Sequence, residues 1–184
     1  MKYRGFDQLL LVLTVFCCLS PVYAESQRPP INVNLIIDGS AGLTGVKEEI
    51  SSWVINRLDQ LLIEGDIVTI WNTGTSAKVV YTGKINSNTD RDTVKKSIQD
   101  ISGSGTLPDF SGALKDAASR PSSGLCYTLL ISASPSALSS LLSGPQAGLM
   151  RYSRVEEFSG WRAIVVGLNL DTKVKRAAAG FYGS

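Results

Sequence analysis

The sequence predicts an α/β domain with three layers, in which helices cover both faces of a mostly parallel central sheet that has one antiparallel edge strand. Short apolar segments alternate along the chain with segments whose apolar residues recur every three or four positions. These are the patterns of buried strands and amphipathic helices. The segments at residues 31–37, 127–131 and 162–168 are largely apolar on both faces, which is typical of parallel strands covered on each side.

Local patterns predict the elements in the following order: a strand at residues 31–37, a helix at 46–62, strands at 66–71 and 78–81, helices at 89–101 and 109–117, a strand at 127–131, a helix at 136–142, a strand at 162–168 and a closing helix at 172–179. The strands at 66–71 and 78–81 form a hairpin, which supplies the antiparallel edge strand. Asp109 is a preferred N-cap residue for the helix that follows it. Within the long connection 144–160, residues 155–158 predict a short helix.

The first residues are typical of an export signal. Lys2 and Arg4 give a positive start, residues 9–19 are apolar, and residues 22–24 end in alanine. We therefore expect a signal peptide at residues 1–24 and a secreted or periplasmic domain at 25–184. The apolar stretch is shorter than the roughly 20 residues that cross a bilayer, so no membrane span is expected after cleavage. A retained anchor and a lipoprotein acylated at Cys17 or Cys18 are the weaker alternatives.

Composition excludes several kinds of chemistry. The chain contains no histidine, so neither a Ser-His-Asp arrangement nor a zinc site of the usual histidine-containing kind can form. Once the signal peptide is removed, Cys126 is the one remaining cysteine, and its apolar neighbours predict a buried, unreactive thiol. The net charge of +2 gives no reason to expect nucleic acid as a partner.

The chain contains the loop Asp38-Gly39-Ser40, the loop Gly105-Thr106 before Asp109, and the strands at 129–132 and 164–167, in this order. Together they resemble segments of the von Willebrand factor A domains, a family with a Rossmann-type sheet. Asp38-Gly39-Ser40 resembles the first half of the family's Asp-x-Ser-x-Ser metal loop, and Gly105-Thr106 before Asp109 resembles the second loop. The strands at 129–132 and 164–167 match the family's fourth and fifth in kind. The resemblance implies a cup for Mg²⁺ or Mn²⁺ with Asp38, Ser40 and Thr106 as ligands. In such a cup, an acidic side chain of a protein partner completes the metal shell.

The sequence departs from this pattern at two ligand positions. Gly42 stands where the family has serine, and Ala133 stands where it has aspartate. Asp109 could replace the lost carboxylate, although an N-cap role explains that residue equally well. In the alternative interpretation, Asp38 accepts backbone N–H bonds in its loop, and Ser40 and Thr106 make local turn bonds. Any metal site is therefore expected to be weak or vestigial.

The resulting hypothesis is a non-catalytic protein-binding module. Its alternatives are a structural subunit of an envelope complex with no metal role, and a phosphoryl-transfer enzyme that uses Asp38. Trp71 and Trp161 lie near strand ends, where an exposed indole could contact a partner. Trp53 lies on the apolar face of its helix, which predicts a core position.

Overall fold

The structure is a computed structural model that describes residues 28–121, 124–134, 136–137, 141 and 153–168. The predicted signal peptide and the predicted closing helix lie outside these residues. None of the described helices is long and apolar enough to cross a bilayer.

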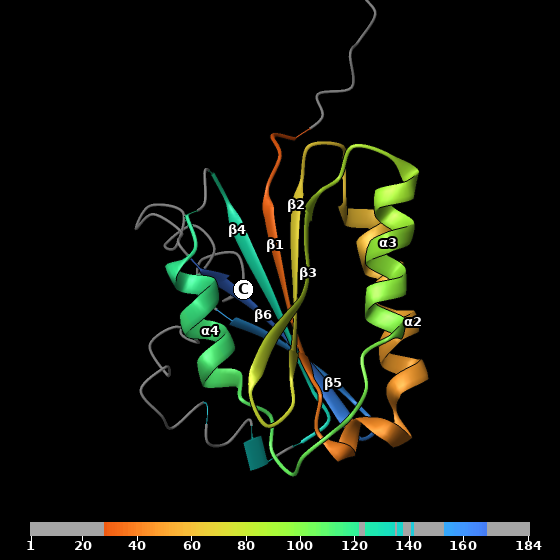
Figure 1. The fold of residues 1–184 in the computed structure, drawn as a ribbon, viewed down its shortest axis with the longest axis vertical. Coiled ribbons are helices and arrows are strands. Elements are labelled where there is room, and N and C mark those ends of the chain that lie inside the picture. Colours follow the sequence, from red (N-terminus) through yellow and green to blue (C-terminus); the bar gives the residue numbers. More distant parts are fainter. Residues whose placement is uncertain (1–27, 122–123, 135, 138–140, 142–152, 169–184) are drawn as a thin grey trace, which may run out of the picture.

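Six strands form one sheet in the spatial order β3-β2-β1-β4-β6-β5. Their bounds are as follows: β1 (Asn32–Asp38), β2 (Ile67–Thr73), β3 (Ala77–Lys84), β4 (Cys126–Ser132), β5 (Ser153–Phe158) and β6 (Trp161–Leu168). The central strand β1 pairs in parallel with β2 on one side and with β4 on the other. The carboxyl ends of β1, β2 and β4 therefore meet at one edge of the sheet, the lower end in Figure 1.

Helices lie on both sides of this sheet (Figure 1). The described helical elements are η1 (Ala41–Gly45), α2 (Lys47–Leu61), α3 (Asn88–Gln99) and α4 (Phe110–Ser119). Buried residues of α2 and α3 pack with Val33 and Leu35 of β1 in one apolar cluster, and buried residues of α4 pack with Ile36 in a second. Successive side chains of β1 point to opposite faces of the sheet, so they belong to two separate apolar cores.

The prediction of a mostly parallel sheet was wrong. Only two of the five neighbouring strand pairs are parallel, because β2–β3, β4–β6 and β5–β6 are antiparallel. The fold is thus a mixed sheet and not the Rossmann-type sheet that the resemblance implies. The antiparallel hairpin of β2 and β3 is present at one edge, but antiparallel pairing also extends over the other end of the sheet.

A second hairpin causes this difference. Residues 155–158, where a short helix was predicted, belong instead to the strand β5. Ser159 and Gly160 form the turn into β6, and Gly160 has a φ of +91°, a conformation that glycine adopts at little cost. Because a tight turn reverses the chain, β6 runs opposite to β5 and enters the sheet antiparallel to β4.

Candidate functional site

The candidate site is the set of loops at the carboxyl ends of β1, β2 and β4, which we call the loop cluster. It comprises residues 38–46, 72–77, 101–109 and 132–134. Polar residues at the ends of parallel strands converge at one edge of a sheet, where α/β proteins commonly place their ligands. The loop cluster contains all four residues predicted to bind metal: Asp38, Ser40, Thr106 and Asp109.

Asp38 is the buried centre of the loop cluster. Its side chain ends β1, and the residue is 0% exposed. Oδ1 accepts the backbone N–H of Ser40 at 2.8 Å. Oδ2 accepts the backbone N–H of Ala133 at 2.9 Å and the hydroxyl of Ser132 at 3.4 Å. Both carboxylate oxygens are therefore occupied by protein donors, and they tie the loop after β1 to the end of β4.

Ser40 and Thr106 lie in adjacent loops but in different environments. Ser40 is buried, and its carbonyl accepts the backbone N–H of Leu43 at the start of η1. Its side chain makes no capping bond to η1. Thr106 is exposed, whereas the carbonyl of Gly105 beside it accepts the N–H of Ala41 at 3.0 Å. The backbones of the two loops thus meet as the resemblance implies.

The two positions that lack the family's ligands lie against each other. A Cβ added at Gly42 would lie 3.3 Å from the carbonyl oxygen of Ala133 and 3.6 Å from Oγ of Ser40. A larger side chain at residue 42 would therefore have to displace the backbone after β4. Residue 42 thus lies close to the backbone after β4, and neither Gly42 nor Ala133 supplies a side-chain oxygen.

Asp109 serves as the N-cap of α4. Oδ1 accepts the backbone N–H of Gly112 at 2.8 Å, the usual bond of an N-cap aspartate. Oδ2 accepts the backbone N–H of Ala77 at 3.3 Å, which links α4 to the start of β3. The close approach depends on glycine, because a Cβ at residue 112 would lie 2.3 Å from Oδ2 of Asp109.

Glycines let the loops of the cluster interlock. A Cβ at Gly39 would lie 1.7 Å from Oδ1 of Asn72, and one at Gly103 would lie 2.4 Å from the carbonyl oxygen of Ser40. The N–H of Ser104 donates to the carbonyl of Gly39 at 2.5 Å. Sequence reasoning did not identify Gly39, Asn72 or Ser132 as site residues. The glycine content of the three loops is the signal that indicates such close approach.

These residues offer few free oxygen ligands to a divalent cation. Mg²⁺ requires about six oxygen ligands in near-octahedral geometry, but the carboxylates of Asp38 and Asp109 already accept backbone N–H bonds. Within the described part of the chain, no three acidic, histidine or cysteine residues are grouped so that they could hold a metal ion. The arrangement instead fits the alternative interpretation, in which Asp38 and Asp109 hold the loops by hydrogen bonds.

The two predicted partner-contact tryptophans are buried, so that prediction needs correction. Trp71 is 1% exposed and donates from Nε1 to Oδ2 of Asp116 at 2.8 Å. Trp161 is 3% exposed and stacks on Phe158, with ring centroids 3.9 Å apart. Each indole side chain faces a helix-covered side of the sheet, because strand alternation directs it inward. A core position was predicted for Trp53. Its side chain is only partly buried and packs against the apolar cluster that contains Trp161.

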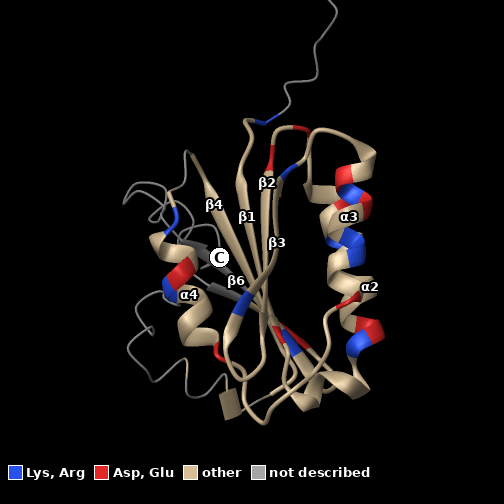
Figure 2. Ribbon diagram, in the orientation of Figure 1, with Lys and Arg blue, Asp and Glu red and all other residues tan. Residues whose placement is uncertain are grey.

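Apart from Asp109, whose carboxylate accepts two backbone N–H bonds, the accessible part of the loop cluster carries no charged residue. Residues 39–46, 72–77, 101–108 and 133–134 contain no Asp, Glu, Lys or Arg. Figure 2 shows charged residues, coloured blue and red, along α2 and α3, whereas the loops at the lower end are mostly tan. Leu107 is 57% exposed in this region. The loop cluster therefore presents a neutral surface of serine, threonine and glycine around one large apolar side chain.

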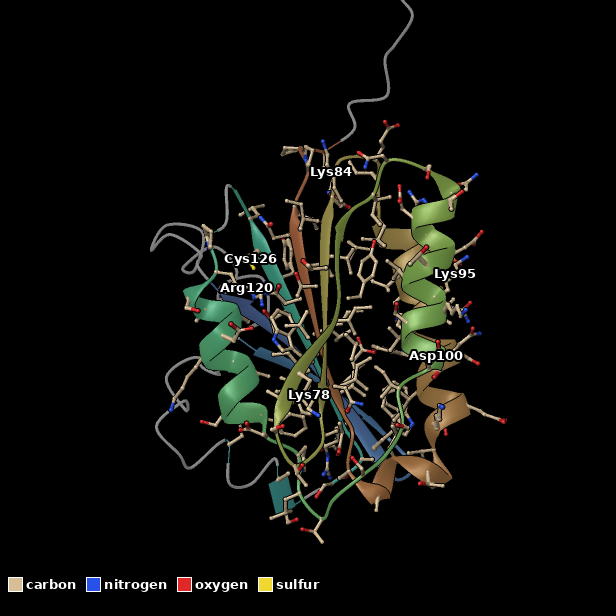
Figure 3. The ribbon with its side chains drawn as sticks, in the orientation of Figure 1. Lys78, Lys84, Lys95, Asp100, Arg120 and Cys126 are labelled. Atoms are coloured by element: carbon tan, nitrogen blue, oxygen red, sulfur yellow. The ribbon has the colours of Figure 1, made fainter. Side chains whose placement is uncertain are left out.

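A pocket with a mixed polar and apolar lining lies at the opposite end of the sheet from the loop cluster. It has a volume of about 190 Å³ and is lined in part by Asn34, Thr69, Arg120 and Cys126. Figure 3 shows Arg120 and Cys126 near the end of α4. Nδ2 of Asn34 donates to Sγ of Cys126 at 3.2 Å, and burial raises the pKa of this thiol. Cys126 is thus the buried thiol that the sequence predicts, since a neutral thiol is a poor nucleophile.

Comparisons with known proteins identify no family for this chain. No protein-family model matches it, and no curated protein matches it. Among solved structures, the chain is similar to the PilB minor pilin from Streptococcus sanguinis, with a TM-score of 0.44 and 17% sequence identity. The similarity covers 53% of this chain and 28% of the pilin, well under two thirds of the pilin's length. A match at this level supports no conclusion about function.

Proposed function

We propose that this chain is an exported, non-catalytic protein-binding module that contacts its partner through the loop cluster without a metal ion. The observation that carries the proposal is the hydrogen bonding of Asp38, whose two carboxylate oxygens accept protein donors from two loops. The aspartate that the resemblance assigns to metal binding thus holds the binding surface in shape. The signal-like pattern of residues 1–24 supports export.

The neutral surface is what favours a protein partner. The cores of protein–protein interfaces are depleted of charged residues, because a charge that leaves water without a partner costs free energy. Apart from Asp38 and Asp109, whose carboxylates accept hydrogen bonds within it, the loop cluster has no charged residue, and it exposes Leu107. Backbone bonds between the loops also lower the entropy that binding must remove. Without a metal ion, nothing in this surface requires an acidic side chain from the partner.

The loops also support a distant kinship with the von Willebrand factor A family. The segment with Asp38 and the segment with Thr106 lie side by side through the bond from Ala41 to Gly105. In this proposal, the chain keeps the family's loop contact and has lost its metal cup. An enzyme that uses Asp38 as a nucleophile is disfavoured, because a fully buried carboxylate cannot reach a substrate.

A capture experiment with matched surface variants tests the proposed function. The purified protein serves as bait in envelope extracts, with and without a chelator, beside the variants Leu107→Lys and Val80→Lys. Val80 is 45% exposed on β3, outside the loop cluster, so it controls for a charge added at an exposed apolar position. Placing a charge in an interface core costs on the order of 1 kcal/mol or more, which weakens binding about tenfold.

We expect the partner to bind in chelator, to be lost with Leu107→Lys and to be kept with Val80→Lys. Loss of capture in the chelator would support the hypothesis that a bound metal ion mediates the contact. Capture that survives Leu107→Lys would mean that the partner binds outside the loop cluster. The second candidate function is a structural subunit of an envelope complex, which the metal-free loops favour equally. It predicts a stoichiometric complex that persists through purification, whereas a binding module is expected to exchange its partner.

A further inference from the structure

The pocket at the end of the sheet opposite the loop cluster, which we call the Asn34 pocket, lies against a polar part of the sheet. On the side where α4 packs, the second apolar core contains one large residue each from β1, β2 and β4: Ile36, Trp71 and Leu130. Two residues earlier on the same strands and the same face are Asn34, Thr69 and Thr128. They are 6%, 5% and 0% exposed. This face thus changes from apolar to polar at the same level of three neighbouring strands.

Packing alone does not account for these three polar residues. When a buried pair of hydrogen-bonded side chains is replaced by apolar groups of the same shape, the stability of a protein changes little or increases. A buried polar group without a partner costs free energy. Polar residues at three adjoining positions therefore favour a polar occupant of the pocket beside them.

Asn34 presents one hydrogen-bond acceptor to the pocket. Its Nδ2 donates to Sγ of Cys126 and to Oγ1 of Thr128, each at 3.2 Å, so both amide hydrogens are used. Among the described residues, no group donates to Oδ1 of Asn34, and this oxygen is not one of the fully buried unpaired atoms. Because Asn34 lines the pocket, its Oδ1 is accessible from there. The two bonds of Nδ2 hold this acceptor in one orientation.

Two threonines on the neighbouring strands supply a donor. Thr69 of β2 and Thr82 of β3 both line the pocket, and their hydroxyl oxygens are 3.1 Å apart. Each hydroxyl has one hydrogen, and the bond between the two oxygens uses one of them. The pair can therefore donate the second hydrogen to a ligand in the pocket.

Arg120 lines the pocket from the end of α4, as Cys126 does from the start of β4 (Figure 3). Its Nε and Nη2 donate to Oδ2 of Asp116 at 3.1 and 2.9 Å, and its guanidinium lies 5.2 Å from the ring of Trp71. These contacts orient the guanidinium, and among the described residues they leave Nη1 available to donate. Because Asp116 balances the charge of Arg120, the pocket does not require an anion.

The size and the remaining lining of the pocket limit the ligand further. The volume of about 190 Å³ is below the roughly 300–1,000 Å³ of pockets that hold drug-sized ligands. Ile67, Ala117 and Pro121 form an apolar part of the lining, which suits a short alkyl group. A carboxylate has no hydrogen to donate to Asn34, and an ammonium group has no acceptor for Arg120. A primary carboxamide has both.

We propose that the Asn34 pocket binds a primary carboxamide on a short alkyl group. The carboxamide nitrogen donates to Oδ1 of Asn34, and the carboxamide oxygen accepts bonds from Arg120 and from the threonine pair. A small free amide and the side chain of a glutamine or asparagine share this chemistry. The pocket lies at the other end of the sheet from the loop cluster, so this proposal does not depend on the proposed function.

NMR titration of the ¹⁵N-labelled protein with two probes of equal size tests the proposal. Propanamide and propanoate have the same shape, but only propanamide can donate to Asn34. We expect propanamide to cause saturable shifts at residues 34, 69 and 82, with a Kd on the order of millimolar, and propanoate to bind about tenfold more weakly. Absence of saturable shifts, or a propanoate affinity equal to or above that of propanamide, would overturn the proposal.

Two matched variants of β3 locate the binding site. Thr82→Val removes a lining hydroxyl at an exposed position of an edge strand, and Val80→Thr makes the reverse exchange at an exposed position of the same strand. We expect the first variant to weaken propanamide binding about two- to tenfold, the value of one hydrogen bond, and the second to leave it unchanged. Equal affinities in the two variants would contradict the site.

A third probe, a capped alanine-glutamine-alanine peptide with an N-methylamide end, distinguishes the two sources of the carboxamide. Tighter binding of this peptide than of propanamide would identify the ligand as a side chain of a protein partner. Weaker binding of the peptide would identify it as a small free amide. Failure of both the peptide and propanamide to bind would overturn the proposal.

Discussion

Two aspartates at opposite ends of the sheet are both 0% exposed, yet their partners differ. Asp66, just before β2, accepts two bonds from the guanidinium of Arg28 at 2.8 and 2.6 Å, and backbone N–H bonds from Ile31 and Ile63. Asp38, at the end of β1, accepts bonds from backbone N–H groups and one hydroxyl. The first carboxylate is paired with a cation, and the second joins two loops.

The comparison separates a structural role from one that shapes a surface. Burial raises the pKa of Asp66, but the Arg28 guanidinium and the N–H groups of Ile31 and Ile63 lower it further, so the pKa lies below its ordinary value. The bonds of Asp66 thus connect the residues before β1 to the start of β2. Asp38 joins loops in which Asp109 is the one other charged residue, so its hydrogen bonds determine the shape of a largely neutral surface.

The largest effect is expected for Asp66→Ala. This change leaves the N–H groups of Ile31 and Ile63 without their acceptor and removes the partner of Arg28. Each N–H group left unsatisfied costs about 1–3 kcal/mol, and the lost pairing with Arg28 adds less than in a fully buried pair, because the Arg28 side chain is 32% exposed. Chemical denaturation measures the loss in the free energy of unfolding. A loss below about 1 kcal/mol would mean that water replaces these bonds and that the comparison with Asp38 does not hold.

Acid is expected to act through the same residue. Because the pKa of Asp66 is lower in the folded protein than in the unfolded chain, its ionised form stabilises the fold above the ordinary value and loses this effect as pH falls through the folded value. Unfolding free energies from neutral pH down to about pH 3 should therefore fall less in Asp66→Asn than in the wild type. Equal slopes would contradict the assignment.

The second largest effect is expected for Asp38→Ala. Two buried N–H groups, those of Ser40 and Ala133, lose their acceptor, at about 1–3 kcal/mol each if unsatisfied. Because loops can relax toward water, we expect a total loss of about 2–3 kcal/mol, smaller than for Asp66→Ala. Hydrogen exchange should rise at residues 39–42 and 133–134, and stay unchanged near Asp66. Exchange that rises over the whole sheet would make Asp38 a general structural residue.

Much of the fold is local and could therefore be predicted. The helix at 46–62 and the strands at 31–37 and 127–131 lie within about two residues of α2, β1 and β4, because apolar spacing specifies them. The hairpin of β5 and β6 was missed, since two adjacent glutamates in 155–158 resemble a solvated helix face. The Ser-Gly pair at residues 159–160 was the available signal, and missing one reversal changed the class of the sheet.

The contact between the candidate loops could be predicted, but their hydrogen bonds could not. The family resemblance located Asp38, Ser40 and Thr106 in loops that do meet, and it located Ala133 opposite Asp38. Hydrogen bonds between residues 94 or 95 positions apart depend on tertiary packing, which periodicity does not encode. The burial of Trp71 likewise depends on α4, whose Asp116 accepts its indole N–H.

A pair of glycine-to-alanine variants tests how tightly the loops of the cluster pack, with a smaller expected loss of stability than in Asp38→Ala. In Gly103→Ala, the new methyl group collides with the backbone carbonyl oxygen of Ser40, 2.4 Å from the added carbon, and overpacking of this kind costs about 1–3 kcal/mol. Gly45→Ala is the control, because nothing lies within 4 Å of a Cβ at that position. Thermal unfolding of the two variants should differ clearly. Equal melting temperatures would mean that the loops adapt and are not interlocked.

The smallest effect is expected for Ser132→Ala. The hydroxyl lies 3.4 Å from Oδ2 of Asp38, a long contact, and it also bonds to the backbone of Ser134. Its removal should cost about 0.5–1.5 kcal/mol, the range of one ordinary hydrogen bond. The double variant with Asp38→Ala should lose less than the sum of the two single losses, because both remove the same bond. Additive losses would show that Ser132 acts apart from Asp38.

The most direct test of the metal-free loop cluster is thermal unfolding with and without divalent cations. The melting temperature of the protein is measured in chelator and in about 1 mM Mg²⁺ or Mn²⁺, beside Asp38→Ala. A bound ion stabilises a fold by RT ln(1 + [L]/Kd), so a site of useful affinity must raise the melting temperature. We predict no shift in either protein. Stabilisation of the wild type by micromolar Mg²⁺ or Mn²⁺, abolished in Asp38→Ala, would contradict the account.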